Sequence, residues 1–428
     1  MTMDTEAKGL PDRIAAALKA DVASIPSLVR ALADEHGARN AGCLNLVASH
    51  NHLGPKAREI LSSSLADQIL SGAPGQRSHS GGAWIEAIDS ITASLCKRIF
   101  GAASVEFRPM SGAQANGVAL GALTRPGDTV IAQPARHGGH KTYREDGYAG
   151  LLGLRVLDMP YDDALATIDL NRLEDLARIH QPKLLLIGTA SLRFPFPLYD
   201  LRTIAGRVGA KLLYDGAHIL GLVAGGQFQH PLREGADILT GSTQKTLGGP
   251  IGGLVLTTEE DAGRAISRAA SRQISNYHNN RIAALAITLA EMEKFGQSYA
   301  AQIVANARSL ARGLDQAGVP VADLERGHTN SHIVVFDTIS VPTGNETFGC
   351  LERARILTSR VELPASHPAR RGIRLGTSAL TRLGMKEADM ARVAALIGRV
   401  TGGEPPARVA ADVTDLARSY RSVQYCFG

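Results

Sequence analysis

A lysine and an aspartate each follow an apolar run in the middle of the chain, and together they could serve an aldehyde cofactor. Lys245 lies in "GADILTGSTQKTLGGP", after a predicted strand and before a glycine-rich turn. A desolvated lysine amine is a good nucleophile and can form a Schiff base with an aldehyde. Asp215, in "KLLYDGAH", could hold the protonated pyridine nitrogen of pyridoxal phosphate. Taken singly, they could also be a surface lysine and a helix-capping aspartate.

Other polar residues also lie beside predicted strands and turns. The segment "MSGAQAN", residues 110–116, opens a predicted helix whose backbone amides could bind phosphate. "ARHGGHKTY" supplies His137 and His140 around a glycine pair, where a ring could stack on a flat cofactor or be an ordinary turn residue. His218 could contact the cofactor or satisfy a buried loop. Arg374, in "GIRLGTSALT", could bind a substrate carboxylate or form a structural ion pair.

Two histidines stand two positions apart in "LNLVASHNHLGP", residues 44–55. His50 and His52 could bind a metal, act as a base or contact a substrate. Histidines at this spacing project together only in particular loop geometries, and the neighbouring sequence offers no third ligand. We therefore expect no metal, and on these residues alone a solvated or core position stays the alternative to substrate contact.

Alternating strands and helices must position these residues. Continuous apolar runs such as "KLLLIG" and "AKLLY" are separated by helical patterns such as "LRTIAGRVG". This order predicts an α/β fold with a mostly parallel sheet covered on both faces, and ligand groups at the strand ends. A long helical segment near 281–317 then leads to "SHIVVFD" and "GIRLGTSALTRLGM", which predict a smaller α/β domain.

Composition narrows the class of protein. The 428 residues exceed the size at which one core usually stops growing, and no apolar run is long enough to span a bilayer. The N-terminus lacks the pattern of a secretion signal, so we expect a cytoplasmic protein. The net charge of +5 comes from scattered basic residues and predicts no nucleic-acid partner. The four cysteines lie far apart, which favours reduced thiols.

From "LNLVAS" to "RLGMKEADM", the chain resembles the serine hydroxymethyltransferase family of fold-type I pyridoxal-phosphate enzymes. The segments that carry the resemblance are "LVAS.N", "SGAQAN", "GDTV" followed by "HGGH", "YDGAH..GL", "ADI..GSTQKTLGGP.GG" and "GIRLGTSALT.LGM". It implies a helical arm at 1–40, a large cofactor-binding domain at 41–285 and a small C-terminal domain at 286–428. It also implies pyridoxal phosphate, an amino-acid substrate and a homodimer with shared active sites.

The same resemblance assigns roles to individual residues. Lys245 would bond to the cofactor, Asp215 would face its pyridine nitrogen, and His137 would stack on its ring. Arg374 would bind the α-carboxylate of the substrate. The remaining cofactor contacts would come from Ser111, Gly112, Ala113, Ser191, His218 and Gln244.

The chain departs from the family in its substrate-facing segments. His50 stands where the family has a glutamate, and His52 where it has a tyrosine. The family's "GKRYYGG", whose second tyrosine helps to position the substrate, is here "GQRSHSGG". His79 therefore stands near the place of that family tyrosine. Gln244 replaces a histidine and Ile251 an arginine. A glycine pair that completes a partner's phosphate site is replaced within "SNYHNN", residues 275–280. We therefore expect His50 to be catalytic and His50, His52 and His79 to contact the substrate.

These departures leave three hypotheses. The first is a folate-independent enzyme of antibiotic or other specialised metabolism, similar to hydroxymethyltransferase-like enzymes of lincosamide pathways. It would act on an amino acid with a bulky β-substituent, such as a cysteine S-conjugate, by β-elimination or decarboxylation. The second keeps aldol chemistry at the Cα–Cβ bond, as a threonine-type aldolase, a transaldolase or a hydroxymethyltransferase for serine or α-methylserine. The third is a cofactor-binding protein without catalysis.

Overall fold

The computed structural model describes residues 9–163, 167–363 and 371–428. In these ranges the α-helices are α1 Leu10–Lys19, α2 Ile25–Asn40, α3 Pro55–Ile60, α4 Ala83–Phe100, α5 Gly112–Leu123, α6 Tyr148–Leu151, α7 Leu170–His180, α8 Leu198–Arg207, α9 Leu220–Ala224, α10 Glu260–Gln273, α11 Asn279–Gln316, α12 Thr347–Arg353, α13 Ser378–Arg382, α14 Glu387–Thr401 and α15 Pro406–Arg418.

Five sheets contain the described strands. The strands are β1 Leu44–Asn45, β2 Gly72–Ala73, β3 Gln76–Arg77, β4 Ser104–Glu106, β5 Thr129–Ala132, β6 Arg155–Asp158, β7 Tyr161–Asp162, β8 Thr167–Ile168, β9 Leu184–Ile187, β10 Lys211–Asp215, β11 Ile238–Ser242, β12 Gly253–Thr257, β13 Ile333–Asp337, β14 Ile356–Leu357, β15 Ser359–Glu362 and β16 Arg371–Gly376.

A seven-stranded sheet forms the centre of the molecule, in the order β4-β12-β11-β10-β9-β5-β6. The pairs among β11, β10, β9, β5 and β6 are all parallel, whereas β12 runs antiparallel to both of its neighbours. All four residues of β9 are buried, as expected for an inner strand covered on both faces. Helix α5 packs against β11 and helix α8 against β10. The predicted α/β class with a mostly parallel sheet is confirmed.

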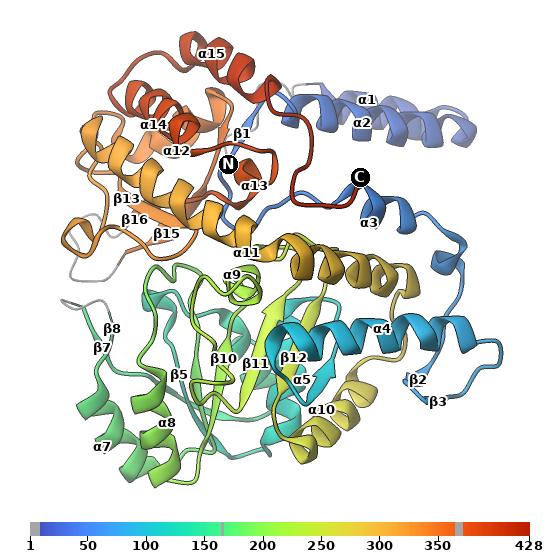
Figure 1. The fold of residues 1–428 in the computed structure, drawn as a ribbon. Coiled ribbons are helices and arrows are strands. Elements are labelled where there is room, and N and C mark those ends of the chain that lie inside the picture. The colour runs from blue at the N-terminus through green and yellow to red at the C-terminus, as the bar shows by residue number, and fades with distance from the viewer. Residues whose placement is uncertain (1–8, 164–166, 364–370) are drawn as a thin grey trace.

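A three-stranded antiparallel sheet, β13-β16-β15, forms the centre of a second core (Figure 1). Helix α11 connects the two cores, because it contributes hydrophobic residues between Ile282 and Val304 to the first and between Ala307 and Leu314 to the second. Strand β1 pairs with β14, so Leu44 and Leu46 also belong to the second core. The predicted domain boundaries stay predictions, and the one at 285/286 falls within α11.

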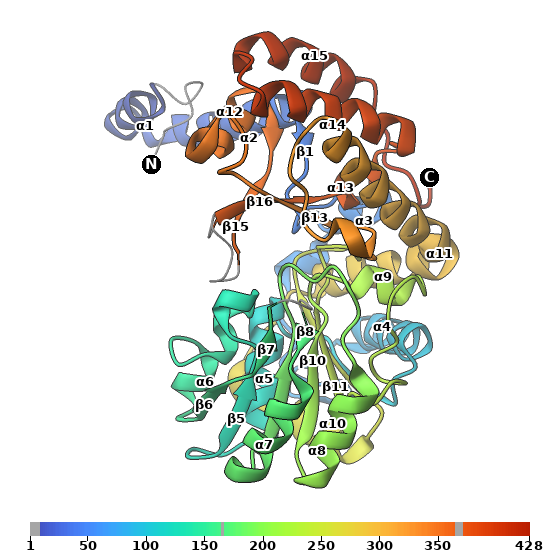
Figure 2. The same cartoon turned by 90° about the vertical axis from the view of Figure 1, so that its left-hand side faces the viewer.

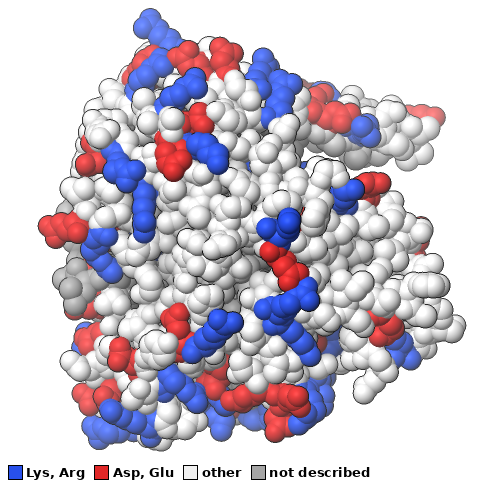
Figure 3. Space-filling view, in the orientation of Figure 1, with Lys and Arg blue, Asp and Glu red and all other residues white. Residues whose placement is uncertain are grey.

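The N-terminal helices project from the body of the molecule. Figures 1 and 2 show α1 and α2 extending outward from the end of the molecule that holds the second core, away from the central sheet. Figure 3 shows basic and acidic side chains interspersed over one face, without a continuous basic stripe on that face. No helix of the described ranges is both long and apolar enough to cross a membrane, and the cytoplasmic location stays a prediction. All four cysteines are free thiols.

Candidate active site

A cavity of about 190 Å³ lies at the carboxyl ends of the parallel strands, and we call it the cofactor cavity. Strand β10 ends at Asp215, and β11 ends at Ser242, three residues before Lys245. Parallel strands place their carboxyl ends at one edge of the sheet, where ligand sites of such folds form. The cofactor cavity is lined by Ser111, Gly112, Ala113, Asn116, His140, Tyr143, Thr189, Ala190, Asp215, Ala217, His218, Ser242, Gln244 and Lys245.

Lys245 has the properties required of a nucleophilic amine. Burial lowers the pKa of its ammonium group from 10.5 to about 8; the negative charge of Asp215 raises this pKa and the positive charge of Arg374 lowers it. The neutral amine is the form that attacks an aldehyde, and the lowered pKa increases its population near neutral pH. The structure therefore places a usable nucleophile beside Asp215.

Asp215 is oriented by hydrogen bonds to both of its carboxylate oxygens. Asn116 Nδ2 donates to Oδ2 at 2.8 Å, and the backbone amide of Ala217 donates to Oδ1 at 3.0 Å. Asn116 is itself held because its Oδ1 accepts a hydrogen bond of 2.6 Å from Thr240. These bonds fix a carboxylate that faces the cavity, as binding of a protonated pyridine nitrogen requires.

The first turn of α5 provides a cradle suited to phosphate. Ser111 caps the helix by accepting a hydrogen bond from the backbone amide of Gln114 at 3.1 Å. The next amides, those of Gly112 and Ala113, have no intrahelical acceptor and lie at the positive end of the helix. A Cβ atom at Gly112 would lie 2.2 Å from Ser242 Oγ, so any other residue there would have to displace this hydroxyl. With Lys245 and Asp215, this cradle fits pyridoxal phosphate.

The structure places His137, the residue predicted to stack on the cofactor, outside the cofactor cavity. The His137 ring stacks on Tyr161, with centroids 4.1 Å apart, and its Nε2 lies 2.9 Å from Asp163 Oδ1. It lines a separate cavity of about 80 Å³. His140 lines the cofactor cavity instead, and its Nδ1 accepts a hydrogen bond from the backbone amide of Thr142 at 3.2 Å. We therefore transfer the proposed stacking role from His137 to His140.

Ser191 also lies outside the lining of the cofactor cavity. Its side chain lines the same 80 Å³ cavity as His137, and its buried Oγ has no hydrogen-bond partner. The two preceding residues, Thr189 and Ala190, line the cofactor cavity. Strand β9 ends at Ile187, four residues before Ser191, and the cofactor contact of Ser191 stays a prediction.

His218 lies in the cofactor cavity as predicted. Burial lowers the pKa of its imidazole well below 6.5, and the charges of Lys245 and Arg374 lower it further, so the ring is neutral at neutral pH. It stacks on the buried ring of His332 at a centroid distance of 5.9 Å. His218 Nδ1 is buried without a partner, which leaves this atom available to a ligand.

Arg374 is a partly buried cation that forms no ion pair with any residue in the described ranges. Its Nη1 donates to the carbonyl of Ala190 at 2.7 Å, and its Nε and Nη2 lie 3.4 and 3.3 Å from Ser359 Oγ. Burial lowers the pKa of the guanidinium group. A partly buried guanidinium held only by neutral acceptors suits a carboxylate that arrives with the substrate.

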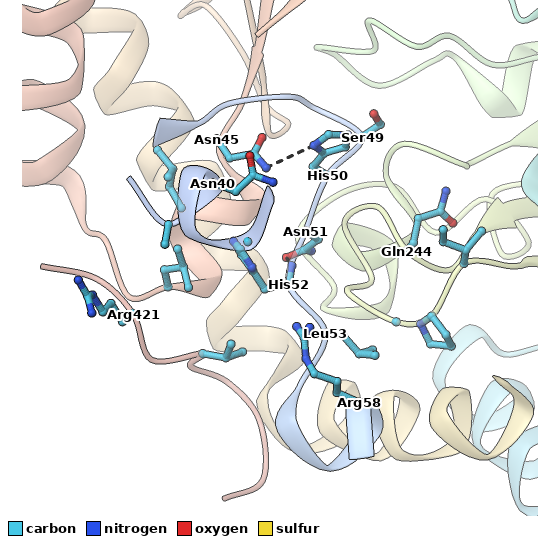
Figure 4. Close-up of a pocket in the computed structure, with 18 of the residues that line it drawn as sticks. Asn40, Asn45, Ser49, His50, Asn51, His52, Leu53, Arg58, Gln244 and Arg421 are labelled. Atoms are coloured by element: carbon cyan, nitrogen blue, oxygen red, sulfur yellow. Dashed lines mark hydrogen bonds between the residues drawn. The ribbon is translucent and has the colours of Figure 1, made fainter. Parts of the chain in front are cut away.

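A second cavity, of about 1290 Å³, contains His50 and His52, and we call it the histidine cavity. Gln244 lines both cavities, so they adjoin next to Lys245. Figure 4 shows His50 and His52 on one loop, with His50 beside Asn45 at a ring-to-amide distance of 3.3 Å. Burial lowers the pKa of both imidazoles, and nearby Arg58 lowers that of His52 further.

His79 is not brought to either cavity within one chain. It follows the β2-β3 hairpin and is exposed, and its Nδ1 accepts a hydrogen bond from the backbone amide of Ser71 at 3.3 Å. The described ranges also contain no group of three or more His, Cys, Asp or Glu side chains placed to hold a metal ion.

The sequence predictions left out several residues that line the cofactor cavity, among them Asn116 and Thr189, and gave the stacking role to His137 instead of His140. His140 belongs to the same "HGGH" segment as His137, and the spacing does not say which ring turns inward. Asn116 follows Gly112 by four residues, so a helical wheel places both on one face of α5. No sequence motif marks Thr189 as a cavity residue; it only follows an apolar run.

Comparison with known proteins gives consistent results. Residues 22–397 match the family model described as serine hydroxymethyltransferase. The chain is 40% identical over 391 residues to the serine hydroxymethyltransferase of Methanocella arvoryzae, covering 90% of this chain and 92% of that protein. It is 38% identical over 409 residues to that of Thermoplasma volcanium, covering 94% and 96%. The solved L-threonine transaldolase from Pseudomonas fluorescens is similar, with TM-score 0.87, 27% identity and 96% coverage of both chains.

Proposed function

The chain belongs to the serine hydroxymethyltransferase family and is a pyridoxal-phosphate-dependent enzyme; we propose that it cleaves the Cα–Cβ bond of a β-hydroxy amino acid without folate. When bound, pyridoxal phosphate supplies an electron sink for negative charge at Cα. In this proposal Lys245 forms the covalent bond to the cofactor, Asp215 faces its pyridine nitrogen, and Ser111, Gly112 and Ala113 bind its phosphate. His140, His218 and Gln244 complete the surroundings of its ring.

The observation that carries this proposal is the pair of histidines beside the cofactor cavity. Their lowered pKa values keep His50 and His52 neutral at neutral pH. A neutral imidazole can accept the proton of a β-hydroxyl group as the Cα–Cβ bond breaks. The β-carbon then leaves as an aldehyde, and the electron pair left on Cα takes up a proton to give glycine. We assign the base to His50 and a substrate contact to His52.

Arg374 favours cleavage at Cβ over loss of carbon dioxide. In our proposal its guanidinium holds the α-carboxylate of the substrate. An ion pair stabilises the carboxylate as an anion, and decarboxylation would have to break that pair. Decarboxylation is therefore disfavoured. β-Elimination from a cysteine S-conjugate is not, and the experiment below must distinguish it from cleavage of the Cα–Cβ bond.

The similar proteins support aldol chemistry more than elimination. The relatives at 36–40% identity carry the name serine hydroxymethyltransferase, and the structural neighbour is an L-threonine transaldolase. Hydroxymethyl transfer from serine moves the β-carbon itself, and a transaldolase exchanges the aldehyde part of the amino acid, so both names describe cleavage of the Cα–Cβ bond. Specialised or antibiotic metabolism stays a hypothesis, since no residue of either cavity supports it directly.

We further propose that the protein works as a homodimer in which His79 contacts the substrate in the site of the partner subunit. His79 lies outside both cavities of its own chain. Near its hairpin, Trp84 is 83% exposed and Ile69 and Ile91 are each 54% exposed, an unusual accumulation of apolar surface. Light scattering should give the mass of a dimer, and a monomer that is fully active would refute the arrangement.

The test is a product analysis with the purified holoenzyme. L-Threonine, L-phenylserine and L-serine, each with and without tetrahydrofolate, are compared with S-substituted cysteines. The proposal predicts glycine and an aldehyde from the β-hydroxy substrates without folate. Thiol, ammonia and pyruvate from the cysteine derivatives alone would establish elimination instead. A strict requirement for tetrahydrofolate would contradict folate independence.

A further inference from the structure

The loop of His50 and His52 is joined to Lys245 through the residue between the two histidines. We propose that Asn51 is a positioning residue: its side-chain amide fixes the main chain of Lys245 and links it to the histidine loop. This inference rests on the proposed function, in which Lys245 bonds to the cofactor. The two segments are far apart in the sequence, and no local pattern connects them.

The first contact is at the carbonyl oxygen of Lys245. This oxygen accepts a hydrogen bond of 2.7 Å from Asn51 Nδ2 and another of 3.1 Å from the backbone amide of Gly248. Gly248 has a φ of +74°, and a Cβ atom there would lie 3.3 Å from Asn51 Nδ2. The turn that follows Lys245 is therefore shaped around the Asn51 amide.

The second contact is within the histidine loop. Asn51 Oδ1 accepts a hydrogen bond of 2.8 Å from the backbone amide of His52. On the other side of this residue, Arg382 Nε lies 3.4 Å from the His52 carbonyl oxygen. Arg382 is fixed by a buried ion pair with Glu291 at 2.7 Å. Asn51 thus holds the backbone amide of His52, while Arg382 holds its backbone carbonyl.

Tyr299 anchors the Asn51 amide to the long helix α11. Its buried hydroxyl accepts a hydrogen bond of 2.9 Å from Asn51 Nδ2 and donates one of 3.0 Å to the carbonyl of Ser378. The guanidinium of Arg382 lies over the same ring, 5.3 Å from its centroid. Because Tyr299 belongs to α11 and Ser378 to α13, Asn51 is held by elements outside the cofactor cavity.

This arrangement has a consequence for the amine of Lys245. A lysine stem is flexible, and fixing its main chain limits how far the amine can move toward water. Burial is the main reason why the pKa of Lys245 falls to about 8. Without Asn51 the turn loosens and the amine gains access to solvent, so its pKa moves back toward 10.5.

The experiment measures how cofactor addition depends on pH, which reports on the amine without catalysis. Apoprotein is mixed with pyridoxal phosphate, and the rate of appearance of the bound-cofactor absorption band is followed from pH 6 to 10. Wild type should show a midpoint near pH 8, whereas Asn51→Ala should shift the midpoint upward by about one pH unit. Tyr299→Phe, which removes only the anchoring hydroxyl, should shift it in the same direction by less.

Control variants separate this inference from the assignment of Lys245. Tyr199→Phe removes a hydroxyl from an exposed tyrosine and should leave the midpoint unchanged. Lys245→Ala should abolish the bound-cofactor band; if it does not, the assignment of Lys245 itself fails. If Lys245→Ala abolishes the band while Asn51→Ala and Tyr299→Phe both keep the wild-type midpoint, only the role of Asn51 is overturned.

Discussion

The cofactor cavity and the histidine cavity adjoin at Gln244 but are organised differently. In the cofactor cavity Asp215, Asn116 and Thr240 form a hydrogen-bonded series that starts from the central sheet. In the histidine cavity the side chains of His50 and His52 are less constrained, and His52 Nε2 is buried without a partner. The first region can bind its cofactor with fixed geometry, whereas the second leaves donors and acceptors for a substrate.

The sequence departures from the family follow the same division. Apart from Gln244, which lines both cavities, the residues proposed to bind pyridoxal phosphate match the family, whereas His50 and His52, which differ from it, line the histidine cavity. This difference indicates that the cofactor chemistry is retained while the choice of substrate has changed. Five predictions test the division.

The largest effect is expected at Asp215, since its carboxylate keeps the cofactor an electron sink. Asp215→Asn preserves shape and removes charge, and kcat should fall by about 10³-fold, the size seen when one preorganised electrostatic group is lost. Steady-state kinetics with the substrate found by product analysis provides the measurement. A loss below tenfold would show that this carboxylate does not face the pyridine nitrogen.

Arg374→Lys should lower kcat/KM by about 10²-fold, because a bidentate contact to a buried carboxylate becomes a point charge. The effect should fall mainly on KM, since the guanidinium binds substrate before the reaction begins. Cofactor affinity, measured by fluorescence, should stay as in wild type. Equal losses in cofactor and substrate binding would mean that Arg374 has a structural role.

His50→Ala tests the histidine cavity. If His50 is the base, kcat at neutral pH should fall by about 10- to 100-fold. The pKa of His50 is lowered by burial, so wild-type activity should rise with pH through a midpoint below 6.5, where the imidazole becomes neutral. The variant should lose this acid limb. An unchanged pH profile would assign the base elsewhere, and Asn45→Ala would then test the neighbouring contact.

His140→Ala and His137→Ala form a matched pair from one turn. Removing the His140 ring should weaken pyridoxal phosphate binding by about tenfold, as expected for one stacking contact. Removing the His137 ring should leave the Kd of the cofactor within twofold of wild type. Equilibrium dialysis of both variants gives the comparison, and the reverse order would restore the role first assigned to His137.

The smallest effect concerns stability in acid. Burial lowers the pKa of His332 to about 3, whereas the unfolded value is near 6.5. Between these values the unfolded state binds a proton that the folded state excludes, so stability falls as pH decreases. From pH 7.5 to 5.5 the loss from this residue should be about 1.4 kcal/mol. Denaturant unfolding should show a smaller pH dependence in His332→Gln, and an equal one would exclude this linkage.

The sequence by itself determined the fold class and the most distinctive site residues. Lys245 and Asp215 each follow a continuous apolar strand, and the carboxyl ends of parallel strands meet at one edge of a sheet. Arg374 could be placed because β16 is a regular strand of a recognisable segment. The alternation of strands and helices is encoded in patterns of several residues, and such patterns tolerate changes in individual side chains.

Only the tertiary structure decided which loop side chains turn toward the cofactor. His140 turns inward because Thr142 holds its ring, and His137 turns away because Tyr161 and Asp163 hold it. The hydrogen bond from Asn51 to the carbonyl of Lys245 could not be predicted from the sequence either. Loop side chains take their direction from contacts with distant segments, and the spacing of residues along the chain does not contain that information.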